Sequence, residues 1–392
     1  MRSAAVLGLA CLGGAAARRA GLHTVRIQPG ADDTAAIADK ELFSEKAAVF
    51  AVFQTNERYF SLVEEPTGRL WLFSRDDGPR LSLHPTATLA RNFTETLALP
   101  RLSPGAALRL VHSRSAAHNF GAVFHGGVVG VGGQDQVAKR LPGQVGVALV
   151  LRTKAPIVDF ASFAPYTAPA ADVVLRGDHA GCVEARRGLQ GRCEFDGKLS
   201  LAPHRGKLLL YARANTAPMQ GGRGVQVSAS TDGELKIWGA FQLVSFLDFQ
   251  NVSAADSNVY FAAVNANPAD NSTVVGLFPV HQGVSAYIAM AISCDGVHFS
   301  SLRKIYKSRA ADSGRTTDHP VDGIVSRGGA VHFYVHRDVP GIAKGNSRIV
   351  RLETTMRKLH DYTHAQKDAL HNRGLCDEVG EREDSDPVVR TM

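Results

Sequence analysis

The stretch RCEFDGKLSLAPHRGKLLLYARAN, residues 192–215, contains two short strand patterns joined by a turn. Its second half holds the aliphatic block Leu208–Tyr211, and short runs of this kind, bounded by Gly, Pro or Asn, are typical of β-strands. Glu194 and Asp196 stand at the head of the first pattern. Because side chains alternate between the two faces of a strand, these carboxylates are expected to point the same way. Their role depends on whether the stretch is unique or one copy of a repeat.

Apolar blocks of the same kind recur along the chain. Their marker residues lie 58, 80, 51 and 72 residues apart, and most blocks are followed by a second strand pattern. The blocks are RLWLFSR from Arg69, GVVGVGG from Gly127, KLLLYAR from Lys207, NVYFAAV from Asn258 and AVHFYVH from Ala330, with markers at Leu70, Val128, Leu208, Val259 and Val331. Five copies of a four-stranded unit predict a β-propeller.

A second, shorter repeat supports this interpretation. SASTDGELKIW (228–238) and AISCDGVHFS (291–300) share Ser-x-Asp-Gly followed by an aromatic residue, and they begin 63 residues apart. An Asp-Gly pair favours a tight hairpin, in which the Ser and Asp side chains accept hydrogen bonds from the turn amides. The aromatic residue is then expected to pack between neighbouring sheets.

The fold expected is therefore all-β, a single five-bladed β-propeller. A secretory signal peptide is predicted over 1–20, the propeller over 21–363 and a polar, flexible tail over 364–392. Residues 22–60 are less regular and are expected to supply an outer strand that closes the ring. A pair of β-sandwiches is the alternative architecture.

The charge pattern bears on the partners. The formal net charge of the 392 residues is +7, and removing the signal peptide with Arg2, Arg18 and Arg19 leaves +4. No Lys/Arg run and no interleaved aromatic residues are present, which argues against nucleic acid binding. The signal peptide predicts a secreted or secretory-pathway protein without stable membrane insertion. A monomer is expected.

The cysteines and the glycosylation sequons also fit a protein that passes through the secretory pathway. Cys182, Cys193, Cys294 and Cys376 follow the signal peptide, and four cysteines allow three disulfide connectivities. Cys182–Cys193 is the favoured pair, because it closes a short loop before Glu194. A zinc site is the alternative, and it is not favoured because neither a Cys-x-x-Cys nor a His-x-x-x-His spacing is recognised. Glycosylation sequons begin at Asn92, Asn251 and Asn271.

Polar residues stand at the start of the innermost strand patterns. In a propeller these positions converge on the central channel. They are His118 and Asn119 in the second copy, Glu194, Asp196 and Arg213 in the third, and Arg315, Asp318, His319 and Asp322 in the fifth. A turn-forming or structural role is the alternative for each of them.

The sequence FDGKLSL…GKLLLYAR and the Ser-x-Asp-Gly hairpins resemble the five-bladed propeller glycoside hydrolases, the superfamily of arabinanases, xylosidases, invertases and levansucrases. The resemblance covers roughly residues 110–340, and the invertase-type Asn-Asp-Pro-Asn signature is absent. It implies a secreted glycosidase with a carbohydrate substrate in the channel.

Such chemistry needs two carboxyl groups on either side of the scissile bond. Asp196 is the expected base or nucleophile, Asp318 its partner and Glu194 the acid. His118, Asn119, Arg213, Arg315, His319 and Asp322 are expected to bind substrate. No metal site and no cofactor are expected, and a structural calcium ion is left open.

Two rival functions fit the same residues. A sialidase would use three arginines to grip a carboxylate, and Arg26 in VRIQP resembles the sialidase Arg-Ile-Pro motif, with Arg213 and Arg315 completing the three. A secreted propeller that binds carbohydrate without turnover is the non-enzymatic rival.

Overall fold

The computed structural model describes residues 34–44, 47, 58–62, 182–183, 198–216, 222–230, 237–249, 257–311, 314–343 and 347–376 with their side chains. Residues 48–53, 57, 63–64 and the strands between 70 and 176 are described by their backbone alone. The predicted signal peptide, Glu194 and Asp196 lie outside the described residues. Within these ranges, no helix combines the length and apolar character needed to cross a bilayer.

The first three sheets each contain four strands. The first has the order β2 (Glu57–Glu64), β3 (Leu70–Asp76), β5 (Ala107–Ser113), β4 (Phe93–Ala98). The second has the order β6 (His118–Phe124), β7 (Val128–Gln134), β8 (Val147–Arg152), β9 (Val173–Arg176). The third has the order β10 (Ser200–His204), β11 (Lys207–Asn215), β12 (Arg223–Ala229), β13 (Gln242–Leu243).

Two larger sheets and one small one follow. The fourth sheet contains β14 (Ser245–Phe246), β15 (Ser257–Val259), β16 (Ala263–Ala266), β17 (Val274–Gln282), β18 (Ser285–Ser293), β19 (His298–Phe299) and β20 (Arg303–Ser308). The fifth contains β1 (Ala47–Phe53), β23 (His319–Pro320), β24 (Val325–Arg327), β25 (Ala330–Arg337) and β26 (Ser347–Thr355). The strands β21 (Ala310–Ala311) and β22 (Arg315–Thr316) pair with each other, and η1 (Thr34–Ala36) is a short 3-10 helix.

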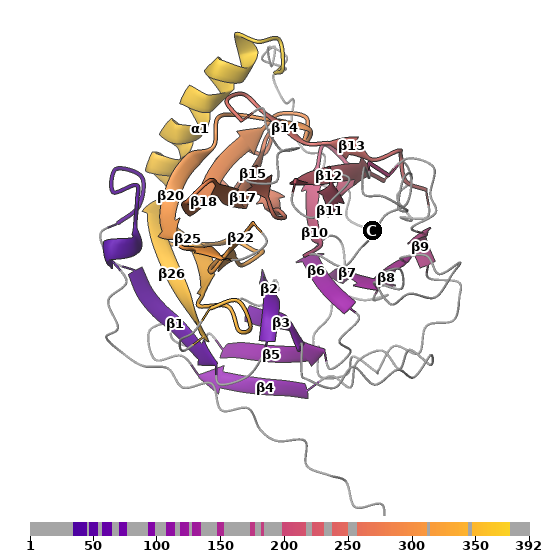
Figure 1. Cartoon of the computed structure of the whole chain (residues 1–392), viewed down its shortest axis with the longest axis vertical. Helices are drawn as coiled ribbons and strands as arrows, with labels where there is room; N and C mark the ends of the chain where they lie inside the picture. Colours follow the sequence, from indigo (N-terminus) through magenta and orange to yellow (C-terminus); the bar gives the residue numbers. More distant parts are fainter. Residues whose placement is uncertain are drawn as a thin grey trace, which may run out of the picture.

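The inner strands of the five larger sheets contact one another in a closed circle. Figure 1 shows this arrangement down the shortest axis of the molecule. β2 contacts β6, β6 contacts β10, β10 contacts β16, and β17 contacts β22 and β23. Ser61 of β2 then pairs with Asp322, just after β23, and this bridge closes the circle. The predicted all-β propeller is confirmed. The blade number stays a prediction, and the described residues hold five sheets of four or more strands and one of two strands.

The burial of the central strands on both faces explains why polar and apolar residues do not alternate in their sequences. In β11 every residue after Lys207 is buried, because the strand lies between two others and is covered on both faces. The sequence of a strand that is buried on both faces is a nearly continuous run of apolar residues. The turn before it consists of Arg205 and Gly206, both with positive φ, which is the geometry of a tight two-residue hairpin.

The Ser-x-Asp-Gly hairpin at 293–296 has the predicted geometry. Asp295 Oδ1 accepts hydrogen bonds from the amides of Val297 and His298 at 2.7 and 2.8 Å, and Ser293 Oγ accepts one from Gly296 at 2.8 Å. The aromatic residue Phe299 is fully buried among rings of the third and fourth sheets. In the other copy, residues 231–236 lie outside the described residues.

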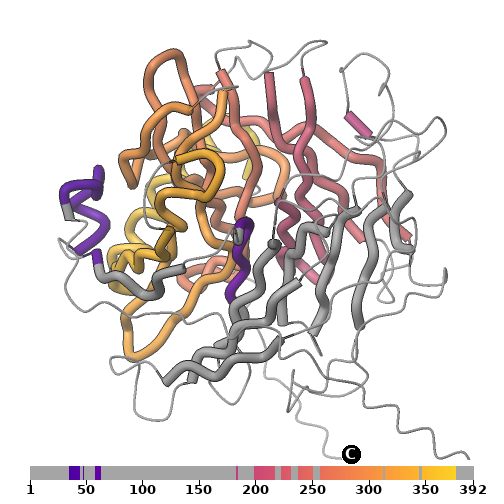
Figure 2. Tube along the Cα trace, turned by 60° about the horizontal axis from the view of Figure 1, so that its bottom comes forward, coloured from indigo at the N-terminus to yellow at the C-terminus, as the bar shows by residue number. Residues whose placement is uncertain are grey.

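The N- and C-terminal parts of the described chain close the fifth sheet together. β1 pairs antiparallel with β26, so the outer strand expected from residues 22–60 is present. Helix α1 (Met356–His371) follows β26 and lies along the outside of the fourth and fifth sheets (Figure 1). Figure 2 shows the trace in a tilted view, with the yellow C-terminal segment among the orange strands that precede it.

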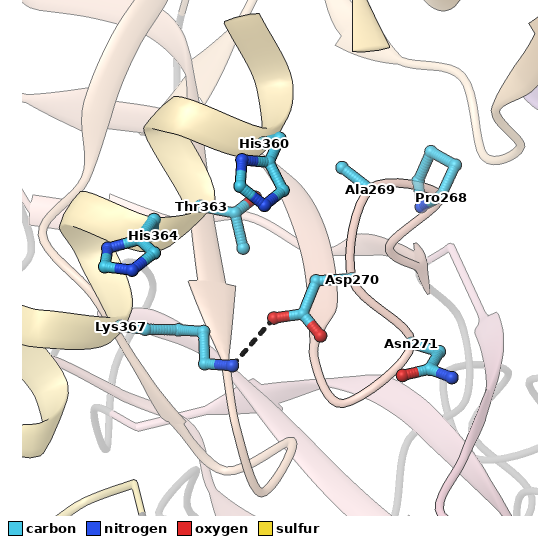
Figure 3. A pocket seen from close by; sticks show the side chains of 8 residues that line it. All are labelled: Pro268, Ala269, Asp270, Asn271, His360, Thr363, His364 and Lys367. Carbon is cyan, nitrogen blue, oxygen red and sulfur yellow. Dashed lines mark hydrogen bonds and ion pairs between the residues drawn. The ribbon is translucent and has the colours of Figure 1, made fainter. Parts of the chain in front are cut away.

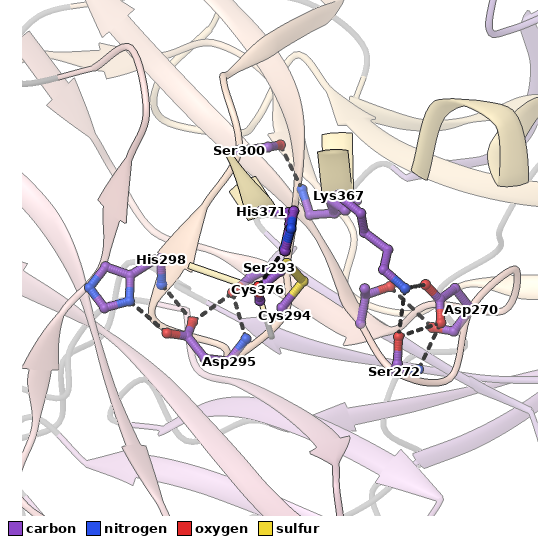
Figure 4. Close-up of a disulfide and its surroundings, with 12 residues drawn as sticks. Asp270, Ser272, Ser293, Cys294, Asp295, His298, Ser300, Lys367, His371 and Cys376 are labelled. Atoms are coloured by element: carbon purple, nitrogen blue, oxygen red, sulfur yellow. Dashed lines mark hydrogen bonds and ion pairs between the residues drawn. A yellow bond between two sulfur atoms is a disulfide. The ribbon is translucent and has the colours of Figure 1, made fainter. Parts of the chain in front are cut away.

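The predicted start of the flexible tail, residue 364, is wrong. It falls inside α1, whose buried face includes Tyr362 and Leu370. A disulfide joins Cys376, after the helix, to Cys294 at the end of β18, with the Cα atoms 5.5 Å apart (Figure 4). The folded part therefore continues to residue 376, because an amphipathic helix and a covalent link fix it. Cys182 is also disulfide-bonded, and its predicted partner Cys193 lies outside the described residues.

Candidate functional site

Five polar side chains meet where the inner strands converge, and we call them the axial cluster: Ser61, Lys198, Ser200, Asn265 and Asp322. They come from β2, from the start of the third sheet, from β16 and from the segment after β23. Lys198 and Asp322 are 0% and 1% exposed. Such polar groups are buried only when they satisfy one another.

Asp322 is the centre of this network. Its Oδ1 accepts hydrogen bonds from Ser200 Oγ at 3.0 Å and from Asn265 Nδ2 at 3.2 Å. Its Oδ2 lies 3.7 Å from Lys198 Nζ and accepts no hydrogen bond from the described part of the chain. The Lys198 ammonium donates instead to Ser61 Oγ. Among the described residues, Oδ1 is therefore held by two hydrogen bonds, whereas Oδ2 is held only by the ion pair with Lys198.

Burial sets the acidity of the pair. It raises the pKa of Asp322 to about 6, although the Lys198 charge and the hydrogen bonds act in the opposite direction. It also lowers the pKa of Lys198 to about 8, against the attraction of Asp322. Desolvation disfavours the charged form of either group. Asp322 thus keeps its proton to a higher pH than an ordinary aspartate.

The backbone holds Asp322 against β2. Its amide donates to Phe60 O at 3.1 Å, and its carbonyl accepts from Leu62 N at 2.6 Å. The next residue, Gly323, has φ +113°, and a Cβ there would lie 2.0 Å from Leu62 O. Only glycine permits both this conformation and this close approach.

An aromatic group lies along the same inner strands, and we call it the tyrosine cluster: Tyr59, Tyr260, Phe261 and His319. The Tyr59 and Tyr260 hydroxyls are 3.1 Å apart. The His319 ring stacks on Tyr59 at 5.6 Å between centroids and meets Phe261 edge-on at 5.0 Å. All four side chains are buried. Tyr59 adopts a positive φ of 55°, which is uncommon outside glycine and places its ring here.

His319 is buried without hydrogen bonds. Neither of its ring nitrogens has a partner within the described residues. Burial lowers its pKa well below the usual range, and the nearby charges of His336, Arg58 and Arg315 act in the same direction. The ring is therefore neutral, with one donor and one acceptor that the described chain leaves unused.

Two arginines border the tyrosine cluster. The guanidinium carbons of Arg213 and Arg223 lie 5.9 and 5.1 Å from the Tyr260 ring centroid. Positive charge at these distances is attracted to the face of an aromatic ring. The cluster is thus a buried aromatic group with two arginines at its border.

The structure brings several predicted residues into these two groups. Arg213 and His319 belong to or border the tyrosine cluster, Arg315 acts on His319 through its charge, and Asp322 is the centre of the axial cluster. His118 and Asn119 begin β6, one of the inner strands, where the backbone alone is described.

Asp318 lies in a different environment from Asp322. Its Oδ1 accepts from the Asp338 amide at 2.9 Å, and burial raises its pKa. Asp338 in turn pairs with Arg309 and Arg348 at 2.7 and 3.0 Å. Within the described residues, Asp318 and Asp322 share no partner.

Most members of the two clusters were not predicted from the sequence. Lys198, Ser200 and Tyr260 stand inside quoted strand patterns, where the alternation of faces could have identified them. Lys198 follows Asp196 by two residues, so in a strand the two side chains are expected to point to the same face. Ser61, Asn265, Tyr59 and Arg223 carry no local signal, because their roles depend on strands from other sheets.

Within the part of the chain that the structure describes, no three His, Cys, Asp or Glu side chains are placed to hold an ion. The expected absence of a metal or cofactor stays a prediction.

No protein-family model matches the sequence, and no curated protein matches it significantly. Solved structures with a similar fold include an N-acetylgalactosamine deacetylase from F. plautii in complex with blood group B trisaccharide, at 12% identity over 86% of this chain and 97% of that chain, with a TM-score of 0.44. An α-L-arabinanase from Penicillium chrysogenum complexed with arabinobiose matches at 12% identity over 78% and 95%, with a TM-score of 0.42. An α-L-arabinofuranosidase from Fusarium graminearum matches at 10% identity over 77% and 94%, with a TM-score of 0.43. At these values of identity and TM-score, the likeness assigns no activity to this chain.

Proposed function

We propose that the protein is a secreted glycoside hydrolase whose substrate binds at the axis of the propeller. The observation that carries the proposal is Asp322, a carboxyl group on the inner ring with a pKa raised to about 6 and one oxygen without a hydrogen bond from the described chain. A carboxyl group that keeps its proton near neutral pH is what a glycosidase needs as its acid.

Asp322 supplies the proton in this proposal. Its Oδ2 donates to the glycosidic oxygen as the bond to the leaving group breaks, which leaves a carboxylate. Lys198 Nζ, 3.7 Å away, then stabilises that new negative charge. The hydrogen bonds to Oδ1 keep the carboxyl group oriented throughout.

The second carboxyl group is proposed to be Asp196, as base or nucleophile. It stands two residues before Lys198 in the sequence, and two residues of strand span about 7 Å. Glu194 is the second candidate for the acid. Asp322 replaces Asp318 as the proposed partner, because Asp318 is engaged by the Asp338 amide.

The tyrosine cluster is proposed to bind the sugar. Aromatic rings offer an apolar face to the C–H surface of a pyranose or furanose, and the nitrogens of His319 would hydrogen-bond to its hydroxyl groups. A ligand hydroxyl group would satisfy polar atoms that are otherwise costly to bury.

Secretion is part of the proposal. Disulfides persist in oxidising compartments, and the described residues contain the Cys294–Cys376 bond. Asn271 begins a sequon and lies exposed in the turn between β16 and β17, where an N-glycan would be accommodated.

A sialidase-like exo-glycosidase is the second candidate. It is favoured by Arg213 and Arg223 beside Tyr260, since an arginine pair next to a tyrosine suits a carboxylated sugar. Turnover of a sialoside in the substrate panel would distinguish this candidate from a glycosidase that acts on neutral sugars.

The test is turnover of a panel of aryl glycosides, with a sialoside included. Asp322→Asn should lower turnover by about 10²-fold or more, the usual contribution of a general acid. Asp318→Asn, a buried carboxyl group of the same type, is the matched control and should stay active if it folds.

A structural role for Asp322 needs its own control, because Asp322→Asn leaves Lys198 buried beside a neutral side chain. The double variant Lys198→Met/Asp322→Leu removes both charges and should fold. An inactive, folded double variant supports catalysis by Asp322. An active double variant, or a wild-type protein that binds sugars without turnover, would overturn the proposal.

A further inference from the structure

A polar pocket of about 560 Å³ lies on the outer surface, away from the axis, between α1 and the turn that joins β16 to β17. Figure 3 shows its walls, with His360, Thr363, His364 and Lys367 on the helix side and Asp270 on the turn side. None of these residues belongs to the axial or the tyrosine cluster.

Two histidines on the helix side are spaced for a common ligand. His360 and His364 are four residues apart, so they lie one above the other on the same helix face. Their ring centroids are 6.4 Å apart, and the side chains are 59% and 70% exposed. A pair at this spacing on one helix is the arrangement with which zinc-binding helices present two imidazoles to one ion.

A carboxylate orients one of the two rings through a hydrogen bond, and a second carboxylate lies near the other ring. His364 Nδ1 lies 3.2 Å from Asp368 Oδ2, and His360 Nδ1 lies 3.6 Å from Asp361 Oδ1. A carboxylate on one ring nitrogen fixes the tautomer and makes the other nitrogen a stronger ligand. Nε2 of His364 is therefore the atom presented to a metal, and the nearby Asp361 carboxylate favours the same nitrogen of His360.

The opposite wall does not offer a third protein ligand. Asp270 Oδ2 accepts from Lys367 Nζ at 2.9 Å, and Asp270 Oδ1 accepts from the amide and hydroxyl group of Ser272 at 2.9 and 2.7 Å. Burial alone would raise the pKa of Asp270, but these hydrogen bonds lower it, so the carboxylate stays engaged. The ion pair fixes the turn against the helix and keeps the space beside the histidines open to water.

We propose that His360 and His364 bind one divalent transition-metal ion, zinc or copper, through their Nε2 atoms, with water in the remaining positions. Imidazole pairs prefer Cu²⁺, Ni²⁺ and Zn²⁺, whereas Mg²⁺ and Ca²⁺ prefer oxygen ligands. Two protein ligands make this a site of modest affinity that is open to exchange. Because only unprotonated imidazole binds a metal, the affinity falls on acidification.

The test is calorimetric titration of the tag-free protein with ZnCl₂ and CuCl₂. Histidines elsewhere in the chain contribute to both curves, so the measured quantity is the binding that His360→Ala/His364→Ala removes. We expect the double variant to lose one binding event, with Cu²⁺ tighter than Zn²⁺ in the wild type and MgCl₂ silent. His371→Ala, on the same helix but outside the pair, is the matched control and should keep that event.

A second variant tests the orienting carboxylate. Asp368→Asn keeps both histidines and should weaken the event by about tenfold or more. Equal titration curves for the wild type and the double histidine variant would overturn the proposal, and so would loss of the event in His371→Ala alone.

Discussion

Lys198 Nζ lies 3.7 Å from Asp322 Oδ2, and both side chains are almost completely buried. Lys198 lies just before β10 of the third sheet and Asp322 just after β23 of the fifth, and the two residues are more than 120 positions apart in the sequence. Their contact, together with the Ser61–Asp322 bridge, connects the first, third and fifth sheets at the axis. Removing one partner of a buried ion pair strongly lowers the free energy of unfolding, whereas replacing both partners with apolar residues has a much smaller effect.

The first prediction is a double-mutant cycle on this pair. Lys198→Met and Asp322→Leu should each lower the free energy of unfolding by about 3–5 kcal/mol, because each leaves one buried charge without its partner. The double variant should lose less than either single variant. Urea unfolding of the four proteins measures the cycle, and additive losses would show that the two charges do not interact.

The second prediction concerns pH. Because burial raises the pKa of Asp322 to about 6, its stabilising contribution is greatest in acid and is lost as the pH rises to about 6. Because burial lowers the pKa of Lys198 to about 8, its contribution increases as the pH rises above about 8. The stability difference between wild type and the double variant should therefore fall from about pH 4 to 6 and rise again above about 8. Urea unfolding at these pH values checks the two signs, and a flat difference contradicts them.

The fold was predictable where the signal is local and repeated. The blocks that start near Leu70, Val128, Leu208 and Val331 coincide with central strands of their sheets, since such strands are apolar on both faces. The Ser-x-Asp-Gly pattern could be read because its hydrogen bonds join residues two or three positions apart.

The site was predictable only in part. Asp322 and His319 stand out beside Pro320 and Gly323, but a lysine at the head of a strand, such as Lys198, reads as a solvated residue. Its burial depends on Ser61 of the first sheet and on Asp322 beside the fifth sheet. The His360–His364 spacing is present in the sequence but was not recognised. The predicted boundary between propeller and tail fell at residue 364, so no helix was expected to carry both histidines.

The third prediction tests the close approach of β2 and the segment after β23. Gly323→Ala should lower stability by more than about 3 kcal/mol, because its Cβ would meet Leu62 O and its φ is +113°. Gly206→Ala is the matched control. It also has a positive φ, +74°, but its Cβ meets nothing within 4 Å, so it should cost only about 1 kcal/mol. Equal melting temperatures for the two variants would contradict the tight contact.

The fourth prediction concerns the corrected C-terminal boundary. A chain ending at residue 376 should keep the wild-type melting temperature, while one ending at 363 loses the buried Leu370 and the Cys294–Cys376 bond. The disulfide spans 82 residues and should contribute roughly 2–5 kcal/mol by limiting the unfolded chain. Cys294→Ser/Cys376→Ser separates this part from the packing of α1. Full stability of the chain ending at 363 would restore the tail to its predicted start.

The last prediction separates binding from packing at His319. Its ring is buried against Tyr59 and Phe261, yet its nitrogens have no hydrogen-bond partner in the described chain. Phenylalanine fills similar space without polar atoms, so His319→Phe should keep or raise the melting temperature, because a buried unsatisfied group is removed. If the nitrogens bind sugar hydroxyl groups, the same change should raise KM by about tenfold, the loss of one hydrogen bond to the ligand. Tyr59→Phe is the control in the opposite sense, since it removes the hydrogen bond to Tyr260 and should lower stability by about 1 kcal/mol. A lower melting temperature with an unchanged KM in His319→Phe would mean that the ring serves the fold alone.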